Sequence, residues 1–161
     1  MTAPIGPDAP AEGPPSAAFD ERTAALARRA EGAARHVEAA RDRVRHLRAG
    51  LAATPGAPAD LGPRLDQAAR RLEEVGRSLS GDPVLGRRAE ADAPSVRDLV
   101  GRVTGFHWDT TGPPTATQQA SVARAEAELQ PLVDALVAVV DVELPAITAT
   151  LDAAGGPWTP R

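Results

Sequence analysis

Apolar residues recur at alternating steps of three and four along the first third of the chain. This spacing places them on one face of an α-helix, and Arg, Glu and Asp fill most of the other faces. The pattern predicts a long helix that begins at Ser16 or Phe19 and ends near Ala49, where glycine and proline follow. Such a helix must pack its apolar stripe against another helix. The stripe consists of Phe19, Leu26, Ala30, Ala33, Val37, Ala40, Val44, Leu47 and Leu51.

A second long helix and a short third one follow the same rule. The stripe at 61–79 predicts a helix that begins near Gly62–Pro63, because proline suits the first turn, and ends at Ser80–Gly81. The short connection between the two long helices makes them an antiparallel hairpin. Apolar residues at 96–103 then predict a short helix that ends before Gly105.

The last long helix begins at a capping box, since Thr115 and Gln118 have the residue types and the spacing that this motif requires. Its apolar stripe runs over 122–139, and the apolar residues beyond are out of step with it. Pro131 and Pro145 lie inside the helix. Each removes a backbone hydrogen bond, so we expect each to kink or split the helix.

Together these patterns predict an all-α fold, an antiparallel helical bundle of three long helices plus one short helix. The last long helix is expected to return along the groove between the first two, with segment 82–104 capping or flanking the bundle. Residues 17–154 form this bundle. Residues 1–16 are rich in Pro, Ala and Gly and are expected to be a disordered leader or linker. Residues 155–161 are expected to be a flexible tail.

Composition excludes several functions and specifies none. With two Phe, two Trp and no Tyr, the core must be built from Ala, Leu and Val. The absence of cysteine excludes disulfides and thiolate metal sites. All 18 basic residues are Arg, which is typical of a GC-rich bacterial genome, and a net charge of −4 does not favour nucleic-acid binding. No signal peptide or membrane span is recognisable, so the chain is expected to be cytoplasmic unless it is a fragment of an exported protein.

The C-terminal half carries an ordered set of capping and packing motifs. Gly81-Asp82-Pro83 is followed by the apolar helix at 96–103, then by Pro114-Thr115-Ala116-Thr117-Gln118 and finally by Leu144-Pro145-Ala146-Ile147. This order resembles the helical C-terminal region of BNR-repeat, sortilin-like "glycosyl hydrolase" proteins, in which β-propellers precede a helical bundle. The resemblance implies an accessory helical domain. Any glycosidase activity of such a protein would reside in the propeller, which this chain lacks, so the resemblance assigns no catalytic residue.

The loop after the short helix holds the most unusual cluster of side chains, His107, Trp108 and Asp109. A histidine beside an aspartate could act as a general base. The interpretation that we favour is structural: Phe106 and Trp108 plug one end of a bundle that has few other large side chains.

Two other sets of polar residues suggest chemistry. His36 and His46 lie about 15 Å apart along one helix, which is too far to share a metal ion. Asp134 and Asp141 share a helical face and could bind a cation or act in acid–base chemistry. A solvated face or a surface ion pair is the favoured interpretation of these carboxylates. We expect no metal and no cofactor.

The expected function is a non-catalytic interaction or assembly module, either an accessory domain of a β-propeller glycosidase-like protein or a free-standing coiled-coil adaptor. The first helix is longer than the second, so the start of its stripe is expected to stay uncovered and to contact a protein partner or a second copy. The enzymatic alternative is a small hydrolase that uses His107 and Asp109. Nucleic-acid binding and membrane insertion are not expected. The predicted contact surface consists of Phe19, Leu26, Ala30 and Ala33.

Overall fold

The computed structural model describes residues 15–82, 85, 88, 93–106 and 113–159. Its described elements are all helical, which confirms the predicted fold class. The helices are α1 (Pro15–Ala52), α2 (Leu61–Ser80), α4 (Val96–Phe106), α5 (Ala116–Val137), the π-helix η1 (Ala138–Glu143) and α6 (Leu144–Ala153). The short helix α4 therefore continues through Gly105, beyond its predicted end.

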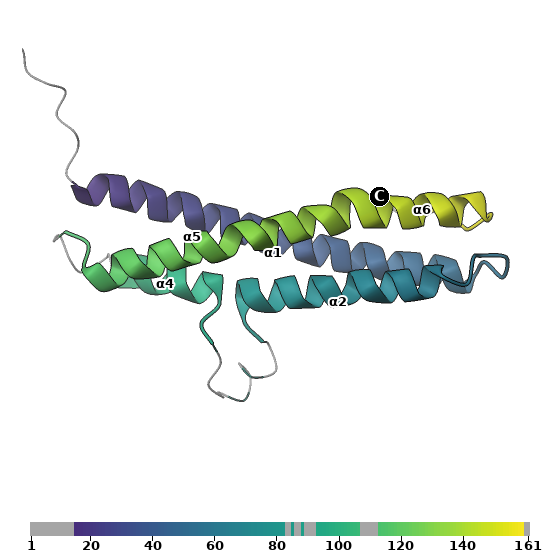
Figure 1. The fold of residues 1–161 in the computed structure, drawn as a ribbon, viewed down its shortest axis with the longest axis horizontal. Helices are drawn as coiled ribbons and strands as arrows, with labels where there is room; N and C mark the ends of the chain where they lie inside the picture. Colours follow the sequence, from purple (N-terminus) through teal and green to yellow (C-terminus); the bar gives the residue numbers. More distant parts are fainter. Residues whose placement is uncertain (1–14, 83–84, 86–87, 89–92, 107–112, 160–161) are drawn as a thin grey trace, which may run out of the picture.

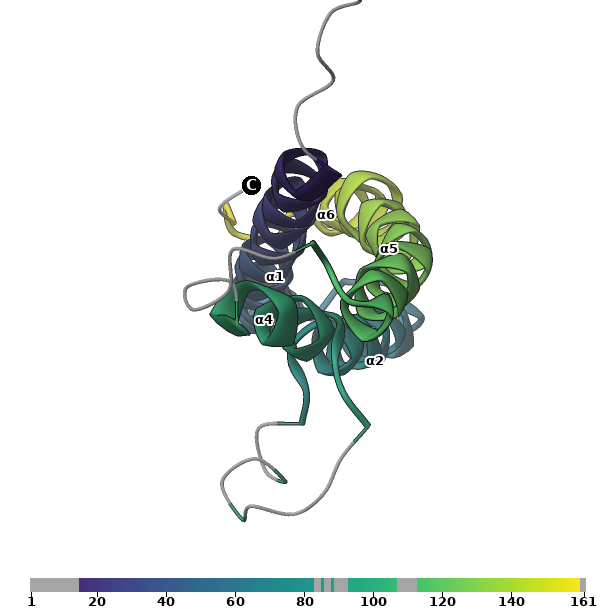
Figure 2. The same cartoon turned by 90° about the vertical axis from the view of Figure 1, so that its left-hand side faces the viewer.

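The helices form three legs that run side by side (Figure 1). The first leg is α1. The second leg returns in the opposite direction and consists of α2 and then α4, which lie end to end. The third leg, α5–η1–α6, runs in the same direction as α1 and packs against α1, α2 and α4. Figure 2 shows α1, α4 and α5 surrounding a common axis at one end of the bundle. The predicted hairpin of the first two helices is confirmed, and so is the return of the last helix between them.

The two prolines of the third leg have different effects. Pro131 lies inside α5, which continues to Val137. This proline is exposed, so water can bind the carbonyl that its ring leaves without a donor. Pro145 stands in the first turn of α6, directly after the π-helix. The predicted split therefore occurs at Pro145 and does not occur at Pro131.

The π-helix explains why the apolar stripe falls out of step. The backbone N–H of Leu144 donates to the carbonyl of Val139, five residues earlier rather than four. Val139 and Leu144 are both fully buried, so the buried positions also step by five at this point. The extra residue of the π-helix thus lets the apolar side chains before and after it face the same core.

The prediction that the start of the first helix is uncovered is wrong. Phe19 and Ala33 are 8% exposed, Leu26 is 3% exposed and Ala30 is 1% exposed. The cause is α4, which continues the second leg beyond the end of α2 and packs against both α1 and α5. The stripe of α1 is therefore buried within the chain, and these four side chains cannot form a contact surface while the bundle stays closed.

The end of the chain packs back onto the bundle as far as it is described. Gly155 has a φ of 77°, and its N–H donates to Asp152 while that of Gly156 donates to Leu151. These two bonds form a Schellman cap, in which glycine tolerates the left-handed backbone. Thr159 is 6% exposed. Within the predicted tail, Thr159 is therefore buried, whereas Trp158 is 82% exposed.

Candidate functional site

The cluster His107, Trp108 and Asp109 lies outside the described residues, so its proposed role as a general base or as an aromatic plug stays a prediction. Phe106 ends α4. Two regions of the described surface are considered as candidate sites, a charged cleft and a more apolar groove.

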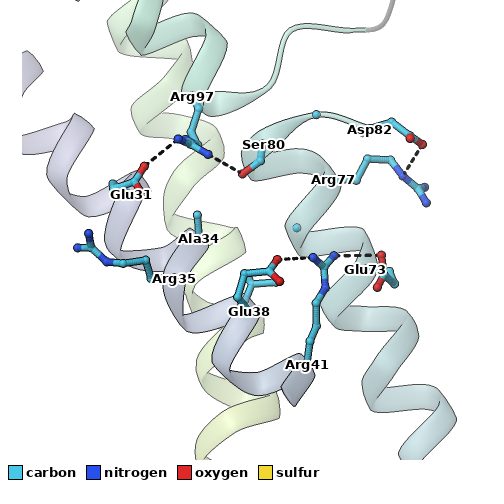
Figure 3. Close-up of a pocket in the computed structure, with 13 residues that line it drawn as sticks. Glu31, Ala34, Arg35, Glu38, Arg41, Glu73, Arg77, Ser80, Asp82 and Arg97 are labelled. Atoms are coloured by element: carbon cyan, nitrogen blue, oxygen red, sulfur yellow. Dashed lines mark hydrogen bonds and ion pairs between the residues drawn. The ribbon is translucent and has the colours of Figure 1, made fainter. Parts of the chain in front are cut away.

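The polar candidate is a charged cleft of about 740 Å³ where α2 ends, α4 begins and α1 passes beneath both (Figure 3). Arg41 of α1 reaches Glu38 on its own helix and Glu73 on α2, the latter at 3.0 Å. Arg97 of α4 lies 2.9 Å from Glu31 of α1. The cleft therefore contains ion pairs that connect the second leg to the first at the break between α2 and α4.

The charges in this cleft compensate one another. Its lining includes Glu31, Glu38, Glu73 and Asp82 together with Arg35, Arg41, Arg77 and Arg97. Four acidic and four basic groups leave no net charge to attract an ion from solution. Most of these side chains are well exposed, and exposed ion pairs contribute about 0–1 kcal/mol each. We interpret the cleft as a structural junction rather than a ligand site.

Gly76 provides the space for the central arginine of this junction. A Cβ at Gly76 would lie 2.5 Å from Nη2 of Arg41 and 3.3 Å from Cγ1 of Val37. The close approach allows the guanidinium of Arg41 to cross the surface of α2 and reach Glu73.

The apolar candidate lies between α1 and α5, the two legs that run in the same direction. A hollow of about 410 Å³ opens over Gly32 and Ala33 of α1 and is walled by Val133, Val137 and other apolar residues of the third leg. Gly32 leaves this space open, because no atom lies within 4 Å of where its Cβ would be. Val137 is 47% exposed, and the other exposed large apolar side chains in the described part of the chain are Val142 at 65% and Trp158 at 82%.

A second hollow of about 430 Å³ continues along the same face between α1 and α6. The two hollows share Val140 and Asp141, so together they form one surface, here called the α1–α5 groove. Its lining from α1 is Arg29, Gly32, Ala33, His36 and Arg43. Its lining from the third leg is Val133, Leu136, Val137, Val140, Asp141, Pro145, Thr148, Ala149 and Asp152.

The two edges of the α1–α5 groove carry opposite charge. The α1 edge has the cations Arg29 and Arg43 with His36 between them, and the opposite edge has the carboxylates Asp141 and Asp152. Bonds across the groove are few: Arg29 donates to Gln130 at 2.8 Å and Arg43 donates to Thr148 at 3.1 Å. The Nε atom of Arg43 is buried and has no hydrogen-bond partner in the described structure.

Both predicted carboxylates lie at this acidic edge or beside it. Asp141 lines the groove, while Asp134 accepts a hydrogen bond from Gln130 at 2.8 Å. Nδ1 of His36 lies 2.9 Å from the carbonyl oxygen of Gly32, and His46 is exposed on α1. In the part of the chain that the structure describes, no group of three or more His, Asp or Glu side chains could hold a metal ion.

Farther towards the start of α1, an ion pair joins the same two legs. Arg22 of α1 donates to both carboxylate oxygens of Glu126 on α5. This hydrogen bond, with the positive charge of the guanidinium, holds the pKa of Glu126 below its usual value despite partial burial, and it raises the pKa of Arg22.

The groove is not among the features predicted from the sequence, although one pattern of apolar residues on the third leg indicates it. Val133, Val137 and Val140 form a second apolar stripe on the third leg, at the same steps of three and four as the core stripe beside it. A helix with two adjacent apolar stripes has more apolar surface than one neighbour covers.

Among the described helices, none combines the length and apolar character that a membrane span requires. Comparison of the chain with models of known families, with curated proteins and with solved structures finds no match in any of the three.

Proposed function

We propose that the protein is a non-catalytic interaction module whose docking face is the α1–α5 groove. The observation that carries the proposal is the apolar surface at the centre of this groove, where Val137 is half exposed beside the open space over Gly32. A contiguous apolar surface in a groove is a site that another chain can cover.

The proposal moves the contact surface from the buried start of α1 to the middle of the bundle. A groove between two parallel helices suits an apolar helix face, because a further helix can pack its side chains between the two legs. One form of the proposal is an accessory domain, and it rests on the resemblance of 81–152 to the helical region of propeller proteins. In this form, the groove is the surface through which the bundle contacts the other parts of the assembly.

Site-specific photo-cross-linking in cells of the native host tests the proposal. A photoreactive amino acid replaces Val137 in one variant and Val142 in a control variant. Val142 is 65% exposed on the same leg but does not line the groove. We expect discrete cross-linked species from position 137 and none from position 142. Cross-linking at neither position, or equally at both, would refute an interaction through the groove.

A further inference from the structure

The α1–α5 groove has a pattern that is complementary to itself. Its centre is apolar, its α1 edge is basic through Arg29 and Arg43, and its opposite edge is acidic through Asp141 and Asp152. Asp134, which is exposed and directly follows the lining residue Val133, adds a further carboxylate on the third leg. Such a groove fits a partner that presents an acidic edge to the basic edge of this chain and a basic edge to its acidic edge.

A second copy of the chain provides such a partner under one type of two-fold symmetry. When the two-fold axis lies parallel to the helices, between two facing grooves, the rotation places α1 of one copy opposite the third leg of the other. The legs of both copies then run in the same directions. The basic edge of α1 in one copy then faces the acidic edge of the third leg in the other. An axis running across the groove would instead place basic on basic and acidic on acidic.

We propose that the protein forms a two-fold symmetric, parallel dimer in which the α1–α5 groove of each copy covers that of the other. The inference deepens the proposed interaction function and rests on it. The contact is isologous, so each charge pair occurs twice. The two Val137 side chains meet near the axis and remove the exposed apolar surface from water.

The size of the groove sets the strength of this dimer. From Arg29 to Arg43 the α1 edge is about 21 Å long, and two helices side by side are about 20 Å wide, which gives about 400 Å² for each copy. The total of about 800 Å² is below the area of about 1,200–2,000 Å² that stable specific interfaces bury, and it falls in the range of weak, transient contacts. We therefore expect a weak, reversible dimer that is populated only at high protein concentration.

Sedimentation equilibrium of the full chain over a range of concentrations tests the apolar part of the interface. The wild type should pass from monomer to dimer, and V142D should do the same. V137D should weaken association more than about tenfold, because each copy would bury a carboxylate in an apolar contact. A wild type that stays monomeric up to millimolar concentration would overturn the dimer, and so would a V137D protein that associates as tightly as V142D.

A charge-exchange pair tests the proposed orientation and does not depend on Val137. One variant, D134R/D141R, leaves Asp152 as the one acidic residue of the third-leg edge, and the other, R29E/H36E, leaves Arg43 as the one basic residue of the α1 edge. Each alone should be monomeric, while an equimolar mixture should form a heterodimer. Since all four positions are exposed or at the rim, helical circular dichroism should confirm that both variants fold. Self-association of each variant without heterodimer formation would overturn the parallel arrangement.

The outcome also separates this inference from the proposed function. A monomeric chain whose position 137 cross-links to a different protein would leave the interaction module standing and would refute the second copy as its occupant. A chain that neither dimerises nor cross-links would refute both.

Discussion

Replacement of Leu26 by alanine tests whether the first half of α1 is covered within the chain. Leu26 is 3% exposed, and two of its neighbours along the stripe, Ala30 and Ala33, are too small to fill the space that its side chain would leave. A buried Leu→Ala change loses transfer free energy and creates a cavity, which together cost about 2–5 kcal/mol of unfolding free energy. For an uncovered stripe the loss would stay below about 1 kcal/mol, because surface changes have small effects.

Urea unfolding followed by helical circular dichroism measures this difference. Leu72→Ala is the matched positive control, because Leu72 is fully buried in α2. Val142→Ala is the matched negative control, because that side chain is 65% exposed and does not line the groove. We expect Leu26→Ala to lose about 3 kcal/mol of unfolding free energy, as Leu72→Ala does, and in a thermal scan this loss should lower the melting temperature by about 6–12 °C. A loss as small as that of Val142→Ala would refute the packing of α4 and α5 over this part of α1.

Three other predictions address single features of the bundle. Thr115→Ala removes the capping box at the start of α5 and should cost about 1 kcal/mol of unfolding free energy in the same assay, whereas Thr117→Ala, in the first turn, should cost less. The pKa of Glu126 is lower in the folded chain than in the unfolded chain. The ion pair therefore contributes stability above the unfolded-state pKa of Glu126, and this stability is lost as pH falls through the folded-state pKa. Urea titrations should therefore show Glu126→Gln to be less stable than wild type at neutral pH, with the gap closing in acid; a constant gap would contradict the ion pair. Deletion of Val142 should leave a folded bundle, because it shortens the spacing between the buried residues Val139 and Leu144 from five residues to four, which a regular α-helix allows. Deletion of Ala127, in the regular part of the helix, should abolish cooperative unfolding.

Most of the fold could be predicted from local patterns. Stripes at helical spacing indicated each described helix, and the capping box at Thr115 has the predicted reciprocal bonds to Gln118. These features depend on residues within a turn or two of one another, so the sequence contains the whole signal. Apart from the step of five between Val139 and Leu144, the burial of the 26 residues in the core follows from the same periodicity.

The coverage of α1 could not be predicted in this way. The pattern at 96–103 indicated a short helix, but not that this helix would continue the line of α2. Its position depends on tertiary packing of Val96, Leu99, Val100 and Val103 against α1 and α5. Without that information, the greater length of the first helix predicts that its start extends beyond its neighbours, which places Phe19 and Leu26 on an exposed surface.

Part of the α1–α5 groove is formed by the same helix irregularity that keeps the core continuous, because Val140 and Asp141 lie within η1. In a regular α-helix a step of five residues turns the chain by about 140° away from its starting face, so Val139 and Leu144 could not both point into the core. The π-helix absorbs the extra residue, and Val140 and Asp141 then lie at the groove while Val139 and Leu144 stay buried. The π-helix thus places Asp141, one carboxylate of the acidic edge, at the groove. A substitution that made this segment a regular helix would have to give up either the burial of Leu144 or the position of Val140 and Asp141 at the groove that we propose as the interaction surface.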